Sequence, residues 1–390
     1  MSLDNYQFKL GFVINANALI YPRKSILAII ILLPLASFFL KCSTKCLCVE
    51  SQAQTISDSI QECNFNMRSI PIPHIPKVLK KMRANGAFNF SLFTRNEKIY
   101  LSYVSTQNEL LFVNLSDSNE IYHSKFPFFG GSSKVYLLKF DADTLHMINK
   151  TDTLYFKILI DNDFAPSVLN EINLNNIVKI KNWFIHYNFR GNVFDYNYPY
   201  LFIPYGIRGP KNLIDSKACL MIDLEKKSFK KIIQFPECYS SCYIDDENVS
   251  LAYKYPHVIG VYSYHSEFVN YNIVNNSETK YSIPLSNGFQ VYDKEEIRNL
   301  AYERKYASSV ERNTNLFFLN DGKFVIFKRV QKNDYKEKDR YRFYCYSSDN
   351  KLLCSDLFPF SLFNRLTVSS KSGFITINDS LSNVYSYEIK

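Results

Sequence analysis

Short runs of β-branched and aromatic residues, separated by clusters of Asn, Asp, Ser and Gly, recur along most of the chain. This alternation is typical of short antiparallel strands joined by turns. Such a run ends in an apolar residue followed by proline at Ile70-Pro71, Phe126-Pro127, Ala165-Pro166, Phe235-Pro236, Ile283-Pro284 and Phe358-Pro359. A mark that recurs over the whole length indicates a repeat architecture. The pattern therefore predicts an all-β fold, a β-propeller.

The number of marks predicts six blades, with seven as the alternative if the long segment between the second and third blades hides another. The last stretch offers only three strands, at Phe363–Val368, Phe374–Ile377 and Val384–Ile389. We expect Arg68–Ile75 to pair with this blade as its outer strand and so close the propeller. Proline suits an outer strand, because one side of that strand has no ladder partner.

The sharpest hairpin signal lies in the fifth predicted blade. There Leu316–Leu319 and Phe324–Phe327 flank Asn320-Asp321-Gly322, and these turn residues tolerate positive φ angles. The sequence predicts a tight hairpin at this point.

The intervals from Pro166 to Pro236 and from Pro284 to Pro359 exceed the length of a normal blade. The segments within them, Val168–Asn197 and Asn287–Asn313, are therefore expected to be insertions. The first carries Trp183 and Tyr196, and the second carries Arg304 and Tyr306 within a helix-like pattern over residues 294–306. Insertions on a repeat scaffold commonly gather on one face. We expect both to rim one binding face.

The charge of the 390-residue chain is positive but not concentrated. There are 46 Lys and Arg against 37 Asp and Glu, a formal charge of +9, and the basic residues form only short groups such as Lys230-Lys231. A nucleic-acid-binding protein normally shows a basic stripe. We therefore expect no nucleic-acid partner, and a monomer.

The N-terminal region indicates export. Arg23-Lys24 precedes the apolar run Ile26–Leu40, which is too short for an ordinary membrane span and suits a signal peptide. Lys41-Cys42 follows, so Cys42 is a candidate lipidation site; an uncleaved membrane anchor and simple secretion are the alternatives. We predict a signal or anchor segment at 1–48, a polar tether at 49–63 and the propeller at 64–390.

Metal and cofactor sites are not expected. The nine cysteines form no CxxC pair, and the six histidines lack acidic or cysteine neighbours at ligand spacing. In an exported chain Cys238 and Cys242 would form a disulfide, or else they would be buried free thiols. No catalytic motif for hydrolysis or nucleotide binding is present, so no catalytic residues are assigned.

A group of aromatic, Arg and His residues near strand ends and in the two insertions remains as the candidate binding set. Arg together with Tyr favours recognition of anionic or sugar-like groups, while the alternative is packing between blades and capping of turns. The candidates are Trp183, Tyr196, Tyr205, Arg208, Tyr255, His257, Arg304, Tyr306 and Arg329.

The strand endings also carry a family resemblance. Lys125-Phe126-Pro127-Phe128 runs into Lys134-Val135-Tyr136, and Tyr306 precedes the hairpin from Phe317 to Arg329. In these features the chain resembles domain-of-unknown-function family 4221 and, more loosely, six-bladed propellers of Bacteroidetes lipoproteins. The resemblance implies a lipid-anchored propeller of unknown activity and supplies no catalytic residues. The chain departs from the family at Lys41-Cys42, where a small residue should precede the cysteine.

Together these features predict a non-enzymatic binding protein of the bacterial cell envelope. It would be tethered in the periplasm or at the outer membrane by lipid at Cys42, or by an uncleaved N-terminal segment, and would recognise a glycan, peptide or protein. The alternative is a hydrolase or lyase that acts at the central depression of the propeller, which would require convergent ionisable groups.

Overall fold

The computed structural model describes residues 65–71, 90–104, 109–115, 121–125, 135–141, 143–149, 152–185, 190–192, 199–208, 214–234, 249–263, 265–284, 311–330, 332, 336, 339–357, 362–369, 373–378 and 383–389. The chain divides into two units, Met1–Leu47 and Cys48–Lys390, and all of these residues belong to the second. None of the helices in these ranges has the length and apolar character needed to span a membrane.

The described strands form six sheets, and each sheet is named here in chain order. The first sheet contains β2 (Phe90–Arg95), β3 (Lys98–Val104), β4 (Glu109–Asn114) and β5 (Ile121–Lys125). The second contains β6 (Val135–Asp141), β7 (Thr144–Asn149), β8 (Leu154–Ile160) and β9 (Pro166–Asn173), and the 3-10 helix η1 (Leu174–Asn176) follows it. The third contains β10 (Trp183–Ile185), β12 (Tyr200–Arg208), β13 (Ile214–Asp223) and β14 (Ser228–Ile232).

The remaining strands complete the set. The fourth sheet contains β11 (Arg190–Asn192), β15 (Val249–Lys254), β16 (His257–Tyr262), β17 (Glu267–Asn272) and β18 (Ser277–Ser282). The fifth contains β19 (Arg312–Phe318), β20 (Phe324–Arg329), β21 (Tyr341–Tyr346) and β22 (Leu352–Leu357). The closing sheet contains β23 (Leu362–Ser369), β24 (Gly373–Asn378), β25 (Asn383–Ile389) and β1 (Phe65–Pro71).

The fold is the predicted all-β propeller, but the predicted blade count is wrong. Five sheets are four-stranded blades, in place of the six or seven expected. The remaining sheet departs from that form because β11 pairs with the innermost blade strand β15 in parallel, through Arg190↔Ser250, Gly191↔Leu251 and Asn192↔Ala252. Since β11 also contacts β19, it lies where the fourth and fifth sheets meet.

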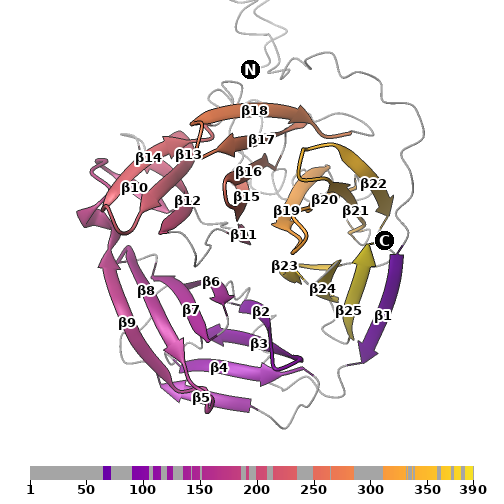
Figure 1. Ribbon diagram of the computed structural model, residues 1–390, viewed down its shortest axis with the longest axis horizontal. Coiled ribbons are helices and arrows are strands. Elements are labelled where there is room, and N and C mark those ends of the chain that lie inside the picture. The colour runs from indigo at the N-terminus through magenta and orange to yellow at the C-terminus, as the bar shows by residue number, and fades with distance from the viewer. Residues whose placement is uncertain are drawn as a thin grey trace, which may run out of the picture. The chain divides into compact units, whose positions relative to one another are not determined.

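The expected pairing of an N-terminal strand with the last sheet is confirmed. Strand β1 is antiparallel to β25, with Arg68 opposite Ser386 and Ile70 opposite Val384 (Figure 1). The strand starts at Phe65 and ends at Pro71, so it is shifted toward the N-terminus from the predicted Arg68–Ile75. Because β1 is the outermost strand of its sheet, Pro71 lies at an edge, where a missing N–H is tolerated.

The predicted hairpin of the fifth sheet is also confirmed. Strands β19 and β20 pair with Phe318 opposite Phe324, and the Leu319 N–H donates to the Lys323 carbonyl at 2.7 Å. Gly322 has a φ of +92°, a conformation that residues with a Cβ rarely adopt.

The prediction that Val168–Asn197 is an insertion outside the blades is wrong. Most of β9, the outer strand of the second sheet, lies in this segment, together with β10, the first strand of the third sheet. It also supplies β11 to the fourth sheet. The helix expected over residues 294–306 lies outside the described residues.

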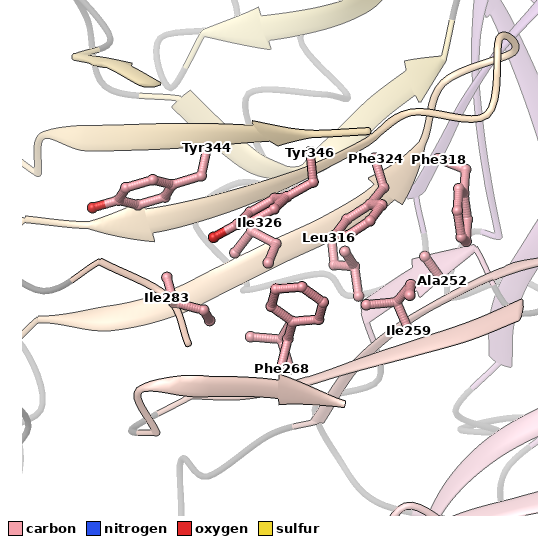
Figure 2. Packing of buried hydrophobic residues seen from close by; sticks show 11 residues of the cluster. Ala252, Ile259, Phe268, Ile283, Leu316, Phe318, Phe324, Ile326, Tyr344 and Tyr346 are labelled. Atoms are coloured by element: carbon pink, nitrogen blue, oxygen red, sulfur yellow. The ribbon is translucent and has the colours of Figure 1, made fainter. Parts of the chain in front are cut away.

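Large aromatic side chains fill the spaces between neighbouring sheets. One buried cluster joins the first and second sheets through Phe93, Phe112 and Phe156, with the Phe93 and Phe112 rings 6.0 Å apart and perpendicular. A second joins the fourth and fifth sheets, and Figure 2 shows Phe268 projecting toward Ile326 from the facing sheet. This interlocking packing fixes one sheet against the next.

Candidate functional site

The interface between the fourth and fifth sheets is apolar in its middle and polar at both ends. Its middle is the cluster that contains Phe268, Phe324 and Tyr346, all of them nearly fully buried (Figure 2). At one end lie the tight turns after β15, β19 and β21, and at the other lies the start of β19.

At the turn end a lysine links the two sheets. Lys254, the last residue of β15, donates from Nζ to the carbonyl oxygen of Asn320 at 2.8 Å and to that of Leu319 at 3.5 Å. The next residue, Tyr255, begins the turn to β16 through a cis peptide bond to Pro256, and it is 38% exposed. Tyr255 is therefore partly exposed at a turn whose base is held in place.

Three side chains form a hydrogen-bonded chain at this end, which we name the amide relay: His257, Asn270 and Asn350. The His257 Nδ1 lies 3.1 Å from the Asn270 Oδ1, and the Asn270 Nδ2 donates to the Asn350 Oδ1 at 2.9 Å. Asn270 is only 6% exposed, whereas His257 and Asn350 are half-buried. The relay thus has a buried centre and two ends that reach the surface.

The direction of the relay fixes the protonation of the imidazole. Because Asn270 gives its NH₂ group to Asn350, its carbonyl oxygen faces His257 and accepts, so the His257 Nδ1 carries the proton. In the neutral ring Nε2 is then an acceptor. The Asn350 Nδ2 is a donor at the opposite end, and neither atom has a hydrogen-bond partner within the described ranges.

The loop that carries Asn350 is held by its own hydrogen bonds. The Ser347 N–H donates to the Lys351 carbonyl at 2.9 Å, and the Asn350 N–H donates to the Ser347 carbonyl at 3.0 Å. Asn350 has a φ of +67°, in the left-handed region where Asn is enriched. The amide of Asn350 is therefore presented from a preorganised turn.

Charged residues on the neighbouring turns are paired with one another. Lys323 lies 2.8 Å from Asp321, and the hydrogen bond that it donates to that carboxylate raises the pKa of Lys323. The Ser347 hydroxyl and then Lys351, as hydrogen-bond donors, lower the pKa of Asp349. The cations and anions of these two turns offset one another, and the relay itself is uncharged when His257 is neutral.

We predict that His257 is the Nδ1–H tautomer in neutral solution. Long-range ¹H–¹⁵N spectra of histidine-labelled protein distinguish the two tautomers, and His257→Gln assigns the signal. Asn270→Leu should shift His257 toward the tautomer mixture of an exposed histidine, because the acceptor is lost. An Nε2–H tautomer in the parent protein would show that the relay runs in the opposite direction.

The other end of the interface holds a buried ion pair. The Lys328 Nζ lies 2.8 Å from the Glu311 Oε2, and both side chains are 2% exposed. Lys328 also donates to the Pro284 carbonyl at 3.3 Å, and the Tyr344 hydroxyl donates to the same oxygen at 3.0 Å. Burial is the main cause of the lowered pKa of Lys328, which Glu311 partly opposes. These groups hold the two sheets together.

Asn313, two residues after Glu311, links the same two sheets by hydrogen bonds. The Asn313 Nδ2 donates to the carbonyl oxygens of Tyr262 at 2.8 Å and His265 at 2.9 Å, and its backbone N–H donates to Ser263 at 2.8 Å. Burial lowers the pKa of His265. This end of the interface is therefore structural in its described contacts.

Burial raises the pKa values of several tyrosine hydroxyls and cysteine thiols. Desolvation raises the pKa values of Tyr344 and Cys345 to about 12, and it also raises those of Tyr155, Cys219, Tyr262 and Tyr346. All of these groups are protonated at neutral pH. No cluster of possible metal ligands occurs among the residues that the structure describes.

Two of the predicted binding residues belong to the site. Tyr255 and His257 lie two positions apart on the turn that leads into β16. The structure adds Asn270 and Asn350, which the sequence analysis did not identify. They are 80 residues apart in the chain, and isolated asparagines near turns are too common to stand out.

The other described candidates lie elsewhere. Trp183, on β10, donates from its indole nitrogen to the Asn175 Oδ1 at 3.0 Å. Tyr205 and Arg329 are 1% and 2% exposed, so both are covered by protein. Arg208 ends β12. Tyr196, Arg304, Tyr306 and Cys42 lie outside the described residues, and the ligand-binding role of this whole set stays a prediction.

Three cysteines fall within the described ranges. Cys219 and Cys345 are free and buried, whereas Cys354 is disulfide-bonded. Cys345 lies directly opposite Cys354 across β21 and β22 but does not pair with it. Cys238 and Cys242 lie outside the described residues, so their predicted disulfide is untested.

Comparisons with known proteins support the fold. No family model and no curated protein matches the chain. The chain is similar to the crystal structure of a member of the DUF4221 family from Bacteroides vulgatus, with a TM-score of 0.58 and 11% identity over 85% of this chain and 99% of that one. At 11% identity this likeness shows a shared propeller fold.

Two further structures are more distant. A luciferin-regenerating enzyme has a TM-score of 0.42 and 10% identity, covering 77% of this chain and 91% of its own. The β-propeller domain of Cps50 (Swd1) from Myceliophteria thermophila has a TM-score of 0.41 and 9% identity, covering 78% of this chain and 83% of its own.

Proposed function

We propose that this chain is a non-enzymatic binding propeller that recognises a glycan, peptide or protein partner through the turns of the fourth and fifth sheets. The observation that supports the proposal is the amide relay, whose buried Asn270 joins two half-buried ends, one of them two residues along the turn from the partly exposed Tyr255. Few, precisely oriented polar groups next to an aromatic surface are typical of a recognition site. The fold of the DUF4221 member supports membership of that family.

Acid–base catalysis is not favoured by this arrangement. The relay contains one ionisable side chain, His257, and its described neighbours Asn270 and Asn350 are amides. General acid–base chemistry usually uses two titratable groups poised near the working pH. Binding requires only the donor and acceptor that the relay provides.

Whether the bound molecule is recovered intact or converted to products distinguishes binding from catalysis. The full chain is incubated with arrayed neutral oligosaccharides and arrayed peptides, and eluted probes are analysed by mass spectrometry. We expect saturable binding with the probe recovered intact. Cleavage or elimination products that accumulate with time and depend on the protein would instead support the hydrolase or lyase alternative.

The proposed location is the bacterial cell envelope, in the periplasm or at the outer membrane. The disulfide at Cys354 supports an oxidising compartment, because such bonds are rare in the cytosol. Together with the apolar run Ile26–Leu40 and the following Cys42, this favours an exported chain tethered by lipid.

Substitution of Cys42 tests the tether. Cys42→Ser removes the acceptor for the lipid and is expected to release the propeller from membranes or to block processing of the N-terminal segment. Cell fractionation and the mass of the mature chain report the two outcomes, and Cys46→Ser and Cys48→Ser test the two competing cysteines. Full membrane retention of Cys42→Ser at an unchanged mass would favour the uncleaved anchor.

A further inference from the structure

We infer that the ligand of the relay is a neutral saccharide, bound with a pair of its hydroxyl groups between the His257 imidazole and the Asn350 amide. This inference rests on the proposed function and names the ligand class of the same site. It depends on three features: a donor at one relay end with an acceptor at the other, the partly exposed Tyr255, and the engagement of the surrounding lysines by carbonyl and carboxylate oxygens.

The relay ends match a polyhydroxyl compound. The His257 Nε2 accepts a hydrogen bond and the Asn350 Nδ2 donates one, while Asn270 joins them through bonds of 3.1 and 2.9 Å. A sugar hydroxyl is both a donor and an acceptor, so one hydroxyl donates to the imidazole and another accepts from the amide. If the relay ran in the opposite direction, His257 would be the donor and Asn350 the acceptor, and a pair of hydroxyls would still match both ends.

The centre of the relay adds rigidity to this match. Asn270 is 6% exposed, and the Asn350 loop is closed by backbone hydrogen bonds of 2.9 and 3.0 Å. Neither end has to give up a protein hydrogen bond within the described ranges in order to bind a hydroxyl. Preorganised groups of this kind lower the entropic cost of binding.

Tyr255 supplies the apolar part of the contact. This residue is 38% exposed on the turn that ends at His257. One face of a pyranose ring presents C–H groups, which pack against an aromatic ring, while the hydroxyls at the ring edge stay available for hydrogen bonds. An exposed tyrosine two residues from an imidazole acceptor suits this combination of surfaces.

The hydrogen bonds already made by the lysines of these turns disfavour an ionic ligand. Lys254 is bonded to the carbonyl of Asn320, and Lys323 is paired with Asp321 at 2.8 Å. The Asp349 carboxylate accepts a hydrogen bond from the Ser347 hydroxyl and forms an ion pair with Lys351 at 3.3 Å. Recognition of a phosphate, sulfate or carboxylate normally relies on uncommitted Arg or Lys groups. The described turn residues commit their lysines to other partners.

Calorimetry of the full chain with a defined panel tests the inference. The panel contains unbranched tetrasaccharides of glucose, galactose, mannose and N-acetylglucosamine, a sulfated tetrasaccharide, and a blocked Ser-Gly-Ser-Gly peptide. Asn350→Asp keeps the acceptor for Asn270 and a side chain that tolerates the left-handed φ, but it removes the donor. Tyr255→Ala removes the ring, and Tyr255→Phe keeps it.

We expect a neutral tetrasaccharide to bind the parent protein, and both Asn350→Asp and Tyr255→Ala to weaken that binding at least about tenfold. Tyr255→Phe and the control Asn275→Ala, in the exposed turn between β17 and β18, should stay within about threefold. Thermal melting of every variant should lie close to that of the parent, so that lost binding is not lost folding.

Other results would overturn the inference. Binding of the peptide in place of the saccharides would exclude the ligand class and leave the binding function in place. Tighter binding of the sulfated probe than of its neutral counterpart would exclude a neutral ligand. Unchanged saccharide affinity in both Asn350→Asp and Tyr255→Ala would place the site elsewhere, and no saccharide binding by the parent would contradict the inference outright.

Discussion

Replacing Lys328 by methionine is expected to lower the free energy of unfolding by roughly 3–5 kcal/mol, because it deprives the buried Glu311 carboxylate of its cation. The two side chains are 2.8 Å apart and 2% exposed, so water cannot take over the role of the ammonium group. Lys328→Met also removes the hydrogen bond to the Pro284 carbonyl. Urea unfolding followed by circular dichroism measures the loss.

Two further variants make this result specific. In the double variant Glu311→Met with Lys328→Met both charges are absent, and most of the loss should be recovered. The matched control is Lys226→Met, since Lys226 is 77% exposed and lies 3.9 Å from Asp223. That change should stay within about 1 kcal/mol of the parent. Equal losses in Lys328→Met and Lys226→Met would contradict the structural role of the buried pair.

Phe268→Ala is expected to cost about 3–5 kcal/mol of unfolding free energy, because it leaves a cavity between the fourth and fifth sheets. The Phe268 ring is fully buried, and its centroid lies 5.0 Å from that of Tyr346, 5.1 Å from that of Tyr281 and 5.4 Å from that of Phe324. Both area burial and aromatic pairing are lost. The same urea experiment measures the change.

A second substitution in the same sheet serves as the control. Val274 lies in the turn between β17 and β18 and is 63% exposed, so Val274→Ala should change stability by less than about 0.5 kcal/mol. Phe268→Leu keeps most of the buried volume and should lose clearly less than Phe268→Ala. Similar stability of Phe268→Ala and Val274→Ala would mean that this interface contributes little to the folded state.

Local sequence signals were sufficient where strand pairing is local. The Asn320-Asp321-Gly322 turn fixes a hairpin by the φ preferences of its own residues, and Gly322 adopts the positive φ that the turn requires. The proline marks were informative for a similar reason. Pro71 and Pro166 lie on the outermost strands β1 and β9, where the absent N–H costs no ladder hydrogen bond.

The strands that the sequence did not reveal depend on distant partners. Strand β11 has only three residues, Arg190, Gly191 and Asn192, and it exists because β15, some sixty positions later in the numbering, offers it a parallel edge. No local propensity of an Arg-Gly-Asn run indicates a strand. This non-local pairing is why one sheet has five strands and why the predicted blade count was wrong.

The candidate site was predictable only in part for the same reason. Tyr255 and His257 were noticeable as an aromatic and an imidazole beside a strand end. Asn270 and Asn350 can be recognised as partners only when β17 and the turn after β21 meet across the interface. In the sequence, each is an ordinary strand or turn asparagine. The direction of their hydrogen bonds appears only in the folded chain.

The central claim is that ligand binds at the turn end of the fourth and fifth sheets, and the histidine signals test it most directly. The chain has six histidines, and His257 is the one in the relay. The full chain, labelled with ¹³C at histidine Cε1, is titrated with the neutral tetrasaccharide that binds most tightly. The account predicts that the His257 signal moves saturably while the signals of His146 and His265 stay in place. Saturable binding that leaves the His257 signal unchanged, or that moves another histidine instead, would contradict the account.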